Sequence, residues 1–237
     1  MTIREEFDKR VAEITSFYEI LSIIELENPR IFAYNTAQSK EDKLIINSSK
    51  IDTLRSTTYL LLYNLIESTV YNSVVSVFDE ISDKGLKYFD IVEDVQKYWL
   101  NNLYKHDDKK KKETIIETIM NVAIQIFNDT IILASNEINY GGSLDAQTIF
   151  ATANSMRIDI GNLHRIYDKN KHGQTLLEIK QKRNWLAHGE KSFIEVGSTS
   201  SFMQLQEAKD YVFVFLGEFI AAVETYITDQ KYKKVAV

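Results

Sequence analysis

The sequence predicts an all-α fold, and three observations support that prediction. Proline occurs once and glycine eight times in 237 residues, so few residues interrupt regular structure. Apolar residues recur at intervals of three and four over long runs, which is the periodicity of amphipathic helices. The evenly spaced turns of a β-sandwich are missing. We therefore expect a helical bundle with long antiparallel helices and helical insertions.

The composition is that of a soluble globular protein, with 44% hydrophobic and 26% charged residues. The chain has no cysteine, which excludes disulfides, zinc–thiolate sites, iron–sulfur clusters and cysteine nucleophiles. Its N-terminus is charged and lacks the apolar core of a signal peptide. The apolar stretch 211–223 contains Glu218 and is short for a membrane span. We expect a cytoplasmic protein with no membrane segment.

The first helix is expected to begin at a capping box formed by Thr2 and Glu5. It should end before Pro29, because proline disfavours helical backbone at the preceding residue. Residues 30–50 are interpreted as a polar connection with a short apolar piece at 44–46.

A long helix should follow, because apolar residues recur at helical spacing from Leu61 to Ile81. Its opposite side carries Asn64 and Glu67. Shorter helices are expected at 85–104, at 113–135, from Asp145 to about Ile158, and from about Thr175 into the segment 183–188.

The last helix should begin at a capping box formed by Ser201 and Gln204. Its apolar residues lie on more than one face, so we expect it to be buried on two sides, one of which could be a subunit interface. No domain boundary is evident. The sequence is interpreted as one domain over 1–237, with an N-terminal helix and connection at 1–50 and a core at 51–237.

The net charge of −6 is unevenly distributed. Residues 161–192 contain seven Lys and Arg against three Asp and Glu, whereas each other region of the chain is net negative. A local positive field can draw a polyanion into a cleft even when the whole protein is acidic. Short windows also fluctuate by several charges, so chance explains the asymmetry equally well.

The basic region contains Arg183 and His188, the candidate functional pair. Arginine binds phosphate through a planar set of donors, and histidine exchanges protons near neutral pH. Together they predict phosphodiester chemistry without a metal.

Arg183 and His188 can act on one phosphate only if the helix end lets a side chain turn back or if a second subunit contributes. Five positions on an ideal helix turn about 500°, which leaves the two side chains about 140° apart. Gly189 is a natural helix-ending residue that would let His188 turn back, or the two groups could serve facing subunits. In the structural alternative, Arg183 pairs with a carboxylate such as Glu67 and His188 caps the terminal carbonyls.

Other kinds of site have less support. No nucleophile elbow, phosphate-binding loop or dinucleotide fingerprint occurs. His164, Asp168 and His172 are spaced four residues apart and could bind a divalent ion on a continuous helix. The polar residues and glycine around His172 favour a solvated helix end instead.

The stretch Arg183-Asn184-x-Leu186-Ala187-His188-Gly189-Glu190 resembles the R-x4–6-H signature of the HEPN superfamily, especially its stand-alone bacterial nuclease branch. Weaker similarity extends to Asn64–Glu67 and to the glycine-rich loop and helix at 141–147. Taken together, the resemblance spans most of the chain from about residue 50.

The resemblance implies a helical bundle that dimerises, so that two motifs face one cleft and cleave RNA without a metal or cofactor. His188 would then act as general acid and base, and Arg183 would hold the scissile phosphate. Asn184 would orient the histidine or the phosphate, with Asn64 and Glu67 in support. The lysines that would guide the RNA backbone are Lys180, Lys182 and Lys191.

The leading hypothesis is a dimeric HEPN endoribonuclease that acts as a toxin or antiviral-defence effector. An antitoxin or another defence-system protein would be its partner. The alternative is a non-catalytic HEPN module that binds a protein partner or a nucleotide. A metal-dependent hydrolase built on His164, Asp168 and His172 is a third, weaker hypothesis.

Overall fold

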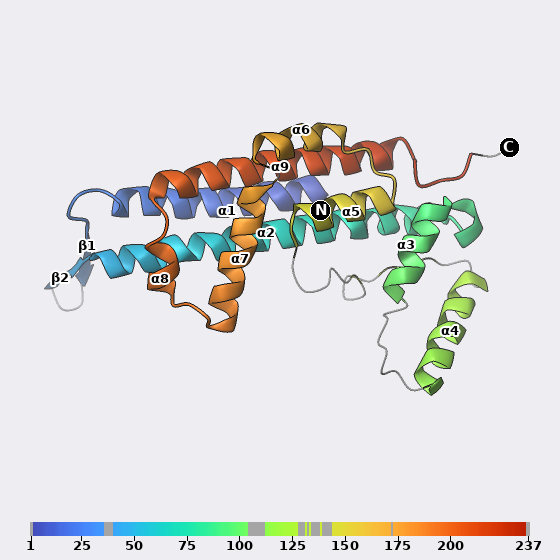
Figure 1. Cartoon of the computed structure of the whole chain (residues 1–237), viewed down its shortest axis with the longest axis horizontal. Helices are drawn as coiled ribbons and strands as arrows, with labels where there is room; N and C mark the ends of the chain where they lie inside the picture. The colour runs from blue at the N-terminus through green and yellow to red at the C-terminus, as the bar shows by residue number, and fades with distance from the viewer. Residues whose placement is uncertain are drawn as a thin grey trace. The chain divides into compact units, whose positions relative to one another are not determined.

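The computed structural model describes residues 2–35, 40–103, 112–127, 131, 133, 138, 144–171 and 173–235. Most of these residues are helical, which confirms the predicted all-α class (Figure 1). The elements in chain order are α1 (Ile3–Ile24), β1 (Arg30–Asn35), β2 (Lys40–Ile45), α2 (Ser48–Asp83), η1 (Tyr88–Asp90), α3 (Glu93–Leu103), α4 (Lys112–Phe127), α5 (Ala146–Ser155), α6 (Gly161–Lys169), α7 (Gln174–His188), α8 (Phe193–Gly197) and α9 (Phe202–Thr228).

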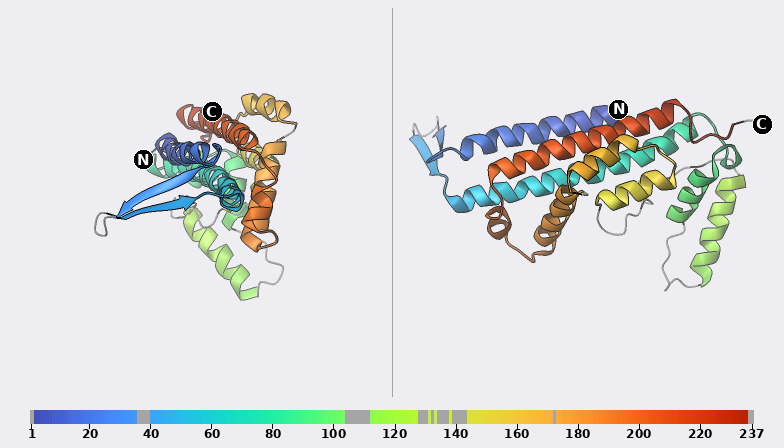
Figure 2. Two further views of the ribbon diagram at one scale, coloured as in Figure 1. Left: turned by 90° about the vertical axis from the view of Figure 1, so that its left-hand side faces the viewer. Right: turned by 45° about the horizontal axis from the view of Figure 1, so that its top comes forward.

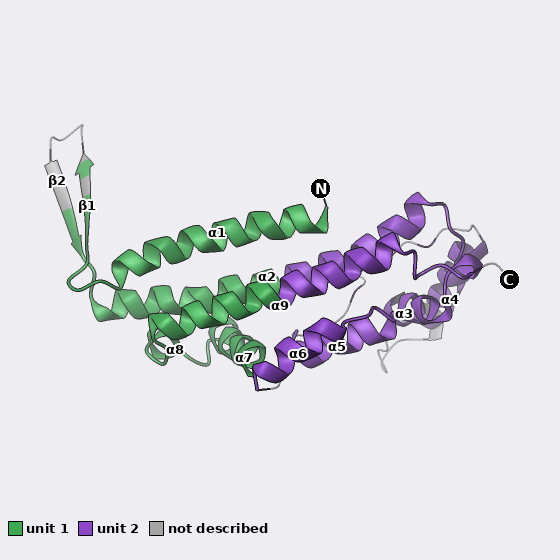
Figure 3. Ribbon diagram, turned by 90° about the horizontal axis from the view of Figure 1, so that it is seen from above, with its two compact units in different colours: residues 1–66, 173–214 green, residues 67–172, 215–237 purple. Residues whose placement is uncertain are grey.

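The chain divides into two compact units, each built from segments that are distant in sequence (Figure 3). Unit 1 comprises residues 1–66 and 173–214, and unit 2 comprises residues 67–172 and 215–237. Helices α2 and α9 contribute to both units, so neither unit is a continuous stretch of sequence. One domain with a core at 51–237 stays a prediction.

In unit 1, α1 begins at the predicted capping box. The Thr2 hydroxyl accepts a hydrogen bond from the Glu5 N–H, and the Glu5 carboxylate accepts one from the Thr2 N–H. The helix ends at Ile24, and Asn28 takes a left-handed φ of 55° immediately before Pro29. Local sequence alone therefore sets both ends of this helix.

Strands β1 and β2 pair in antiparallel orientation, so the interpretation of these residues as a polar connection was wrong (Figure 2). Arg30 pairs with Ile45, and Ile31 pairs with Leu44. Large apolar and aromatic side chains favour strands, and Ile31, Phe32 and Tyr34 lie in one short run. A count of helical periodicity does not detect so short a pattern.

Tyr18 connects α1 to the rest of unit 1. Its hydroxyl donates to the Leu205 carbonyl at 2.9 Å, and its ring centroid lies 6.4 Å from that of Phe202. Burial raises the pKa of Tyr18, which keeps the hydroxyl protonated as a donor. At the end of α1, Glu25 accepts two hydrogen bonds of 2.6 Å from Arg55. These contacts hold α1 against the unit 1 portions of α2 and α9.

Helix α8 packs on the beginning of α2. The Ser56 hydroxyl donates to the Phe193 carbonyl, and Gly197 lies directly against the Asp52 backbone. A Cβ atom at residue 197 would overlap the Asp52 carbonyl and lie 2.8 Å from the Asp52 Cα. The backbone of Gly197 is not in the left-handed region, so the close approach to Asp52 is what requires a glycine here.

Unit 2 has an aromatic core. Phe78 stacks on Tyr98 with ring centroids 6.2 Å apart, and Phe150 meets Phe215 at the same distance. Trp99 is fully buried in α3. These rings join α3 and α5 to the unit 2 portions of α2 and α9.

The expected helix over 85–104 is shorter than predicted. Residues 90–92 instead pair with the C-terminal segment, where the Val92 N–H donates to the Tyr232 carbonyl and the Lys234 N–H donates to the Asp90 carbonyl. Helix α3 therefore begins only at Glu93.

Two further helices of unit 2 differ in how well their ends were predicted. Helix α4 ends at Phe127, short of the expected end at residue 135. By contrast, α5 begins as expected, because the Asp145 carboxylate accepts a hydrogen bond from the Thr148 N–H. Residues 128–130 and 141–143, which include the glycines of the predicted glycine-rich loop, lie outside the described residues.

Helix α9 is long and apolar enough to cross a membrane by length and composition, and it is the one such helix in the part of the chain that the structure describes. Residues on its apolar side are completely buried, namely Val212, Phe215, Leu216, Phe219, Ile220 and Val223. Burial of one side is typical of a core helix, and we interpret α9 as one.

Replacement of Gly197 by alanine is expected to destabilise the protein by about 1–3 kcal/mol, because the added methyl group forces α8 away from Asp52. Urea unfolding followed by circular dichroism would measure the loss. Gly161→Ala is the matched control, since its Cβ would meet only the side chain of Asp159, at 3.4 Å. Equal stability of the two variants would contradict the close approach.

Candidate functional site

Helix α7 carries the motif and ends directly after His188. Gly189 takes a left-handed φ of 70°, and the Glu190 N–H donates to the Trp185 carbonyl at 2.9 Å. The Gly189 N–H donates to the Leu186 carbonyl at 3.4 Å. This Schellman motif confirms that Gly189 ends the helix. It leaves His188 exposed in the last turn.

Arg183 is half-buried and held by two contacts within unit 1. Its guanidinium carbon lies 4.3 Å from the centroid of the Tyr63 ring, and Nη1 donates to Asn184 Oδ1 at 3.2 Å. Tyr63 is fully buried in α2, so its ring is a fixed support for the cation. Such a contact contributes about 0.5–2 kcal/mol. Over the described residues Arg183 forms no ion pair with a carboxylate.

His188 has no hydrogen-bond partner within the described ranges, so its imidazole can rotate to meet a ligand. It follows Arg183 by five positions on a regular helix, which separates the two side chains by about 140°. The structure therefore places both groups on α7 but on different sides of it. One α7 helix does not aim them at a single phosphate.

The two supporting residues on α2 differ in their placement. Asn64 is exposed in unit 1, next to Tyr63, and no hydrogen bond joins it to the motif in the described chain. Glu67 is half-buried in unit 2. Burial, and then the Glu67 charge, raise the pKa of Tyr71. A role for Asn64 and Glu67 in the site stays a prediction.

Among the three predicted RNA-backbone lysines, Lys180 and Lys191 are partly exposed. Lys191 Nζ lies 3.4 Å from the centroid of the Trp185 ring. Lys182 differs, because its side chain is only 8% exposed and its ammonium group points into unit 1. This burial counts against a contact between Lys182 and the RNA backbone, and the assignment stays a prediction.

Lys182 is the centre of a buried polar cluster. Its ammonium donates to the Tyr59 hydroxyl at 2.9 Å, to the Ser200 hydroxyl at 2.7 Å and to the Glu178 carboxylate at 2.6 Å. The Tyr59 and Ser200 hydroxyls are also hydrogen-bonded to each other at 2.7 Å. The cluster joins α7 to α2 through Tyr59, and to the segment before α9 through Ser200.

The protonated form of Lys182 is stabilised in spite of its burial. Burial lowers its pKa, but the hydrogen bonds to Glu178 and Tyr59 outweigh that effect and leave the pKa above the ordinary value. A buried ammonium with three partners is a positional constraint, because rotation of α7 would leave it unpaired.

The exposed side of α7 contains a hollow of about 430 Å³. Its lining comes from α7 and the turn that follows, namely Leu177, Lys180, Gln181, Asn184, Trp185 and Glu190. Two predicted site residues, Lys180 and Asn184, are thus brought together here. His188 follows Asn184 by four residues, which places it on the same face of the helix.

A family model described as HEPN_MAE_28990-like HEPN matches residues 1–232. The chain belongs to this HEPN family. No curated protein and no solved structure matches it. The match to the HEPN model extends over both compact units and includes the whole of α7, the helix that carries Arg183 and His188.

Three features of the candidate HEPN site were missed in the sequence, namely the support of Arg183 by Tyr63, the Lys182 cluster and the indole wall of the hollow. The Lys182 cluster had a detectable signal. Lys182 follows Ile179 by three positions and precedes Leu186 by four, and both of those residues are buried. That spacing places the lysine on the inward face of the helix.

The alternative metal site is only partly described. His164 lies on α6 and stacks on Phe150, with ring centroids 4.8 Å apart. His172 lies outside the described residues. No group of three potential ligands occurs within the described ranges, so the set of His164, Asp168 and His172 stays a prediction.

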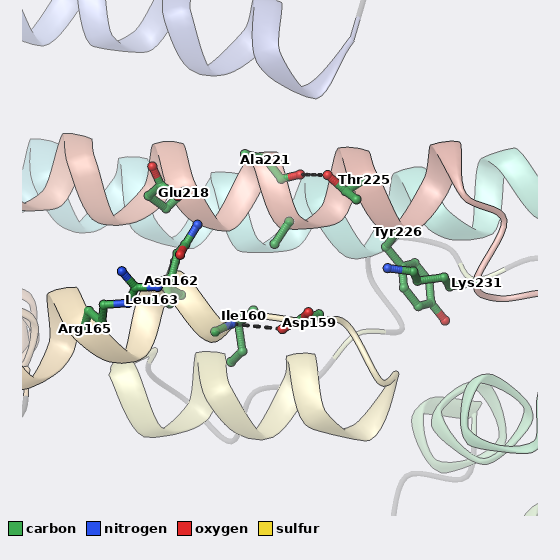
Figure 4. Close-up of a pocket in the computed structure, with 12 residues that line it drawn as sticks. Asp159, Ile160, Asn162, Leu163, Arg165, Glu218, Ala221, Thr225, Tyr226 and Lys231 are labelled. Atoms are coloured by element: carbon green, nitrogen blue, oxygen red, sulfur yellow. Dashed lines mark hydrogen bonds between the residues drawn. The ribbon is translucent and has the colours of Figure 1, made fainter.

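A second cavity, of about 350 Å³, lies in unit 2 between α6 and the unit 2 part of α9 (Figure 4). Arg165 and Lys231 lie at opposite sides of it, and Asp159 and Glu218 also line it. This balance of charges selects no class of ligand. None of its lining residues belongs to the HEPN motif.

Replacement of Lys182 by methionine is expected to destabilise the protein by about 1–3 kcal/mol, because the Glu178, Tyr59 and Ser200 groups lose their buried donor. Urea unfolding at pH 7 would measure the change. Lys180→Met, on the same helix but partly exposed, is the control and should change stability little.

The difference in stability between wild type and Lys182→Met should depend on pH, because the pKa of Lys182 is raised in the folded protein. A raised folded-state pKa gives stability that is fully present below the unfolded-state pKa, about 10.4 for lysine, and is lost as the pH rises through the folded-state pKa. The gap between wild type and Lys182→Met should therefore stay constant from about pH 6 to about pH 9, and should narrow only above about pH 10.4. A gap that already shrinks toward pH 9 would contradict this assignment.

Proposed function

We propose that this HEPN protein is a dimeric, metal-independent endoribonuclease. The observation that carries the proposal is the complete motif, with a fixed cation and a mobile proton-transfer group at the end of α7. Arg183 is held by Tyr63 and Asn184, while the exposed His188 is unrestrained. A phosphodiester needs both kinds of group, one to bind its charge and the other to move protons.

The proposed reaction is attack by the ribose 2′-hydroxyl on the adjacent phosphate. His188 accepts the proton of that hydroxyl, or donates a proton to the departing 5′-oxygen, in its two protonation states. Arg183 neutralises the charge that develops on the phosphate oxygens. The products are a 2′,3′-cyclic phosphate and a 5′-hydroxyl. Because the RNA supplies the nucleophile, the step requires no metal-bound water.

A second copy of the chain solves the geometrical problem of the motif. Within one α7 helix, Arg183 and His188 point to different sides. In a two-fold dimer the same patch of both subunits meets at the axis, so Arg183 of one subunit can approach His188 of the other. The homodimer is part of the proposal for this reason.

The proposed setting is the cytoplasm, where the protein would act on RNA as a toxin or antiviral-defence effector. An unregulated ribonuclease would damage its own cell, so an antitoxin or other defence-system protein is the proposed partner. The non-catalytic alternative, a HEPN module that binds a protein or nucleotide, predicts no RNA cleavage at all.

Wild-type protein should cleave single-stranded RNA in the presence of EDTA, and His188→Ala should lower the rate by about 10²- to 10⁴-fold. Gel analysis of labelled RNA, with mapping of the 2′,3′-cyclic ends, would measure both. His164→Ala replaces another exposed histidine and is the control for surface changes. Cleavage that is undiminished in His188→Ala would remove this residue from the mechanism.

The composite arrangement has its own test. Arg183→Ala and His188→Ala proteins should each be inactive, but a co-expressed mixture should recover about a quarter of wild-type activity, since a two-fold heterodimer regains one Arg–His pair. Activity assays on the purified mixture, with differently tagged chains to confirm heterodimers, would measure this. Heterodimers as inactive as the parent proteins would contradict a site shared between subunits.

A further inference from the structure

The hollow on the exposed side of α7 has the dimensions of a small-molecule site. Its volume, about 430 Å³, lies within the range of about 300–1,000 Å³ found for ligand pockets. It combines apolar side chains with a few polar groups, which is the usual composition of such sites. Leu177 and Trp185 supply the apolar surface, and the other four lining residues supply polar groups.

Trp185 gives the hollow a stacking surface. The indole is half-buried and lies in the last turns of α7, so the helix fixes its position. Lys191 contacts the indole but is not among the residues that line the hollow. Stacking on an aromatic side chain is the common mode of binding an unpaired base.

Polar groups that line the hollow supply donors and acceptors for the edge of a base. Asn184 Oδ1 already accepts from Arg183, so its amide nitrogen remains as a donor. Gln181 adds a donor and an acceptor, and Glu190 adds a carboxylate acceptor. A carboxylate accepts from the exocyclic amino group of a base, which adenine, cytosine and guanine have and uracil lacks.

The hollow also lies close to the proposed proton-transfer group. Asn184 and His188 are about one helical turn apart, or about 5.4 Å. A base in the hollow therefore lies beside the group that would transfer protons at the scissile phosphate.

We propose that the hollow lined by Gln181, Asn184, Trp185 and Glu190 binds one unpaired nucleobase next to the scissile phosphate and favours bases with an exocyclic amino group. The proposal rests on the ribonuclease function for its biological substrate. The binding chemistry itself, base stacking with edge recognition, is shared by single-stranded RNA and free mononucleotides.

Binding is tested with the His188→Ala protein, which holds RNA without the proposed proton transfer. The chain has two tryptophans, and Trp99 is fully buried, so quenching of the emission by RNA reports on Trp185. Ten-nucleotide oligoadenylate and oligocytidylate should quench it, and oligouridylate should bind more weakly. AMP and UMP form the mononucleotide arm of the same titration.

Variants of the lining should change affinity in a defined way. Trp185→Leu should weaken binding of fluorescein-labelled oligoadenylate by about 5- to 100-fold, as expected for the loss of one stacked base. Gln181→Ala should weaken it less and cannot disturb the core, because Gln181 is exposed. Glu190→Gln should reduce the discrimination against uracil, whereas Glu207→Gln, an exposed change on α9, should not.

The outcomes separate this inference from the proposed function. If the wild type cleaves RNA but affinity and base preference are unchanged in Trp185→Leu, Gln181→Ala and Glu190→Gln, the base site is overturned and the ribonuclease proposal stands. Absence of cleavage, with AMP quenching of Trp185 that is weakened in Gln181→Ala, would support the base site and count against the ribonuclease. Absence of any response to RNA, AMP or UMP would overturn the base site directly.

Discussion

The buried ammonium group of Lys182 is the constraint on which the geometry of α7 depends. A charge in a protein interior is tolerated only when it is paired and hydrogen-bonded. Here the three partners are Tyr59, Glu178 and Ser200. Tyr59 belongs to α2, and Ser200 lies just before α9, so the helix is fixed against two other segments of unit 1.

The rotation of α7 then decides the position of every group in the site. With Lys182 inward, Arg183 lies on the Tyr63 ring. The stripe of Leu177, Gln181, Asn184 and His188, spaced four, three and four residues apart, faces outward. This arrangement creates the hollow and leaves the imidazole free. It also separates the cation from the histidine, which is why the proposed catalytic role includes a second subunit.

Local patterns predicted some elements well because their causes are local, whereas errors arose where distant segments decide the structure. Thr2 and Glu5, like Ser201 and Gln204, satisfy each other's backbone donors at the start of a helix. Residues 90–92, by contrast, pair with the C-terminal segment instead of extending a helix. In the sequence, Lys182 looks like another surface cation of a basic segment. Its buried position depends on Tyr59 and Ser200, which are 123 and 18 residues away along the chain.

The amino-acid sequence by itself determined the all-α class, the ends of several helices and the presence of the motif on a helix that stops at Gly189. These properties depend on the periodicity of apolar side chains and on backbone hydrogen bonds between near neighbours. Tertiary structure alone decided which side of α7 is buried, what supports Arg183 and where a hollow opens beside His188. Those features require contacts between α7, α2 and the segment before α9, which no local pattern encodes.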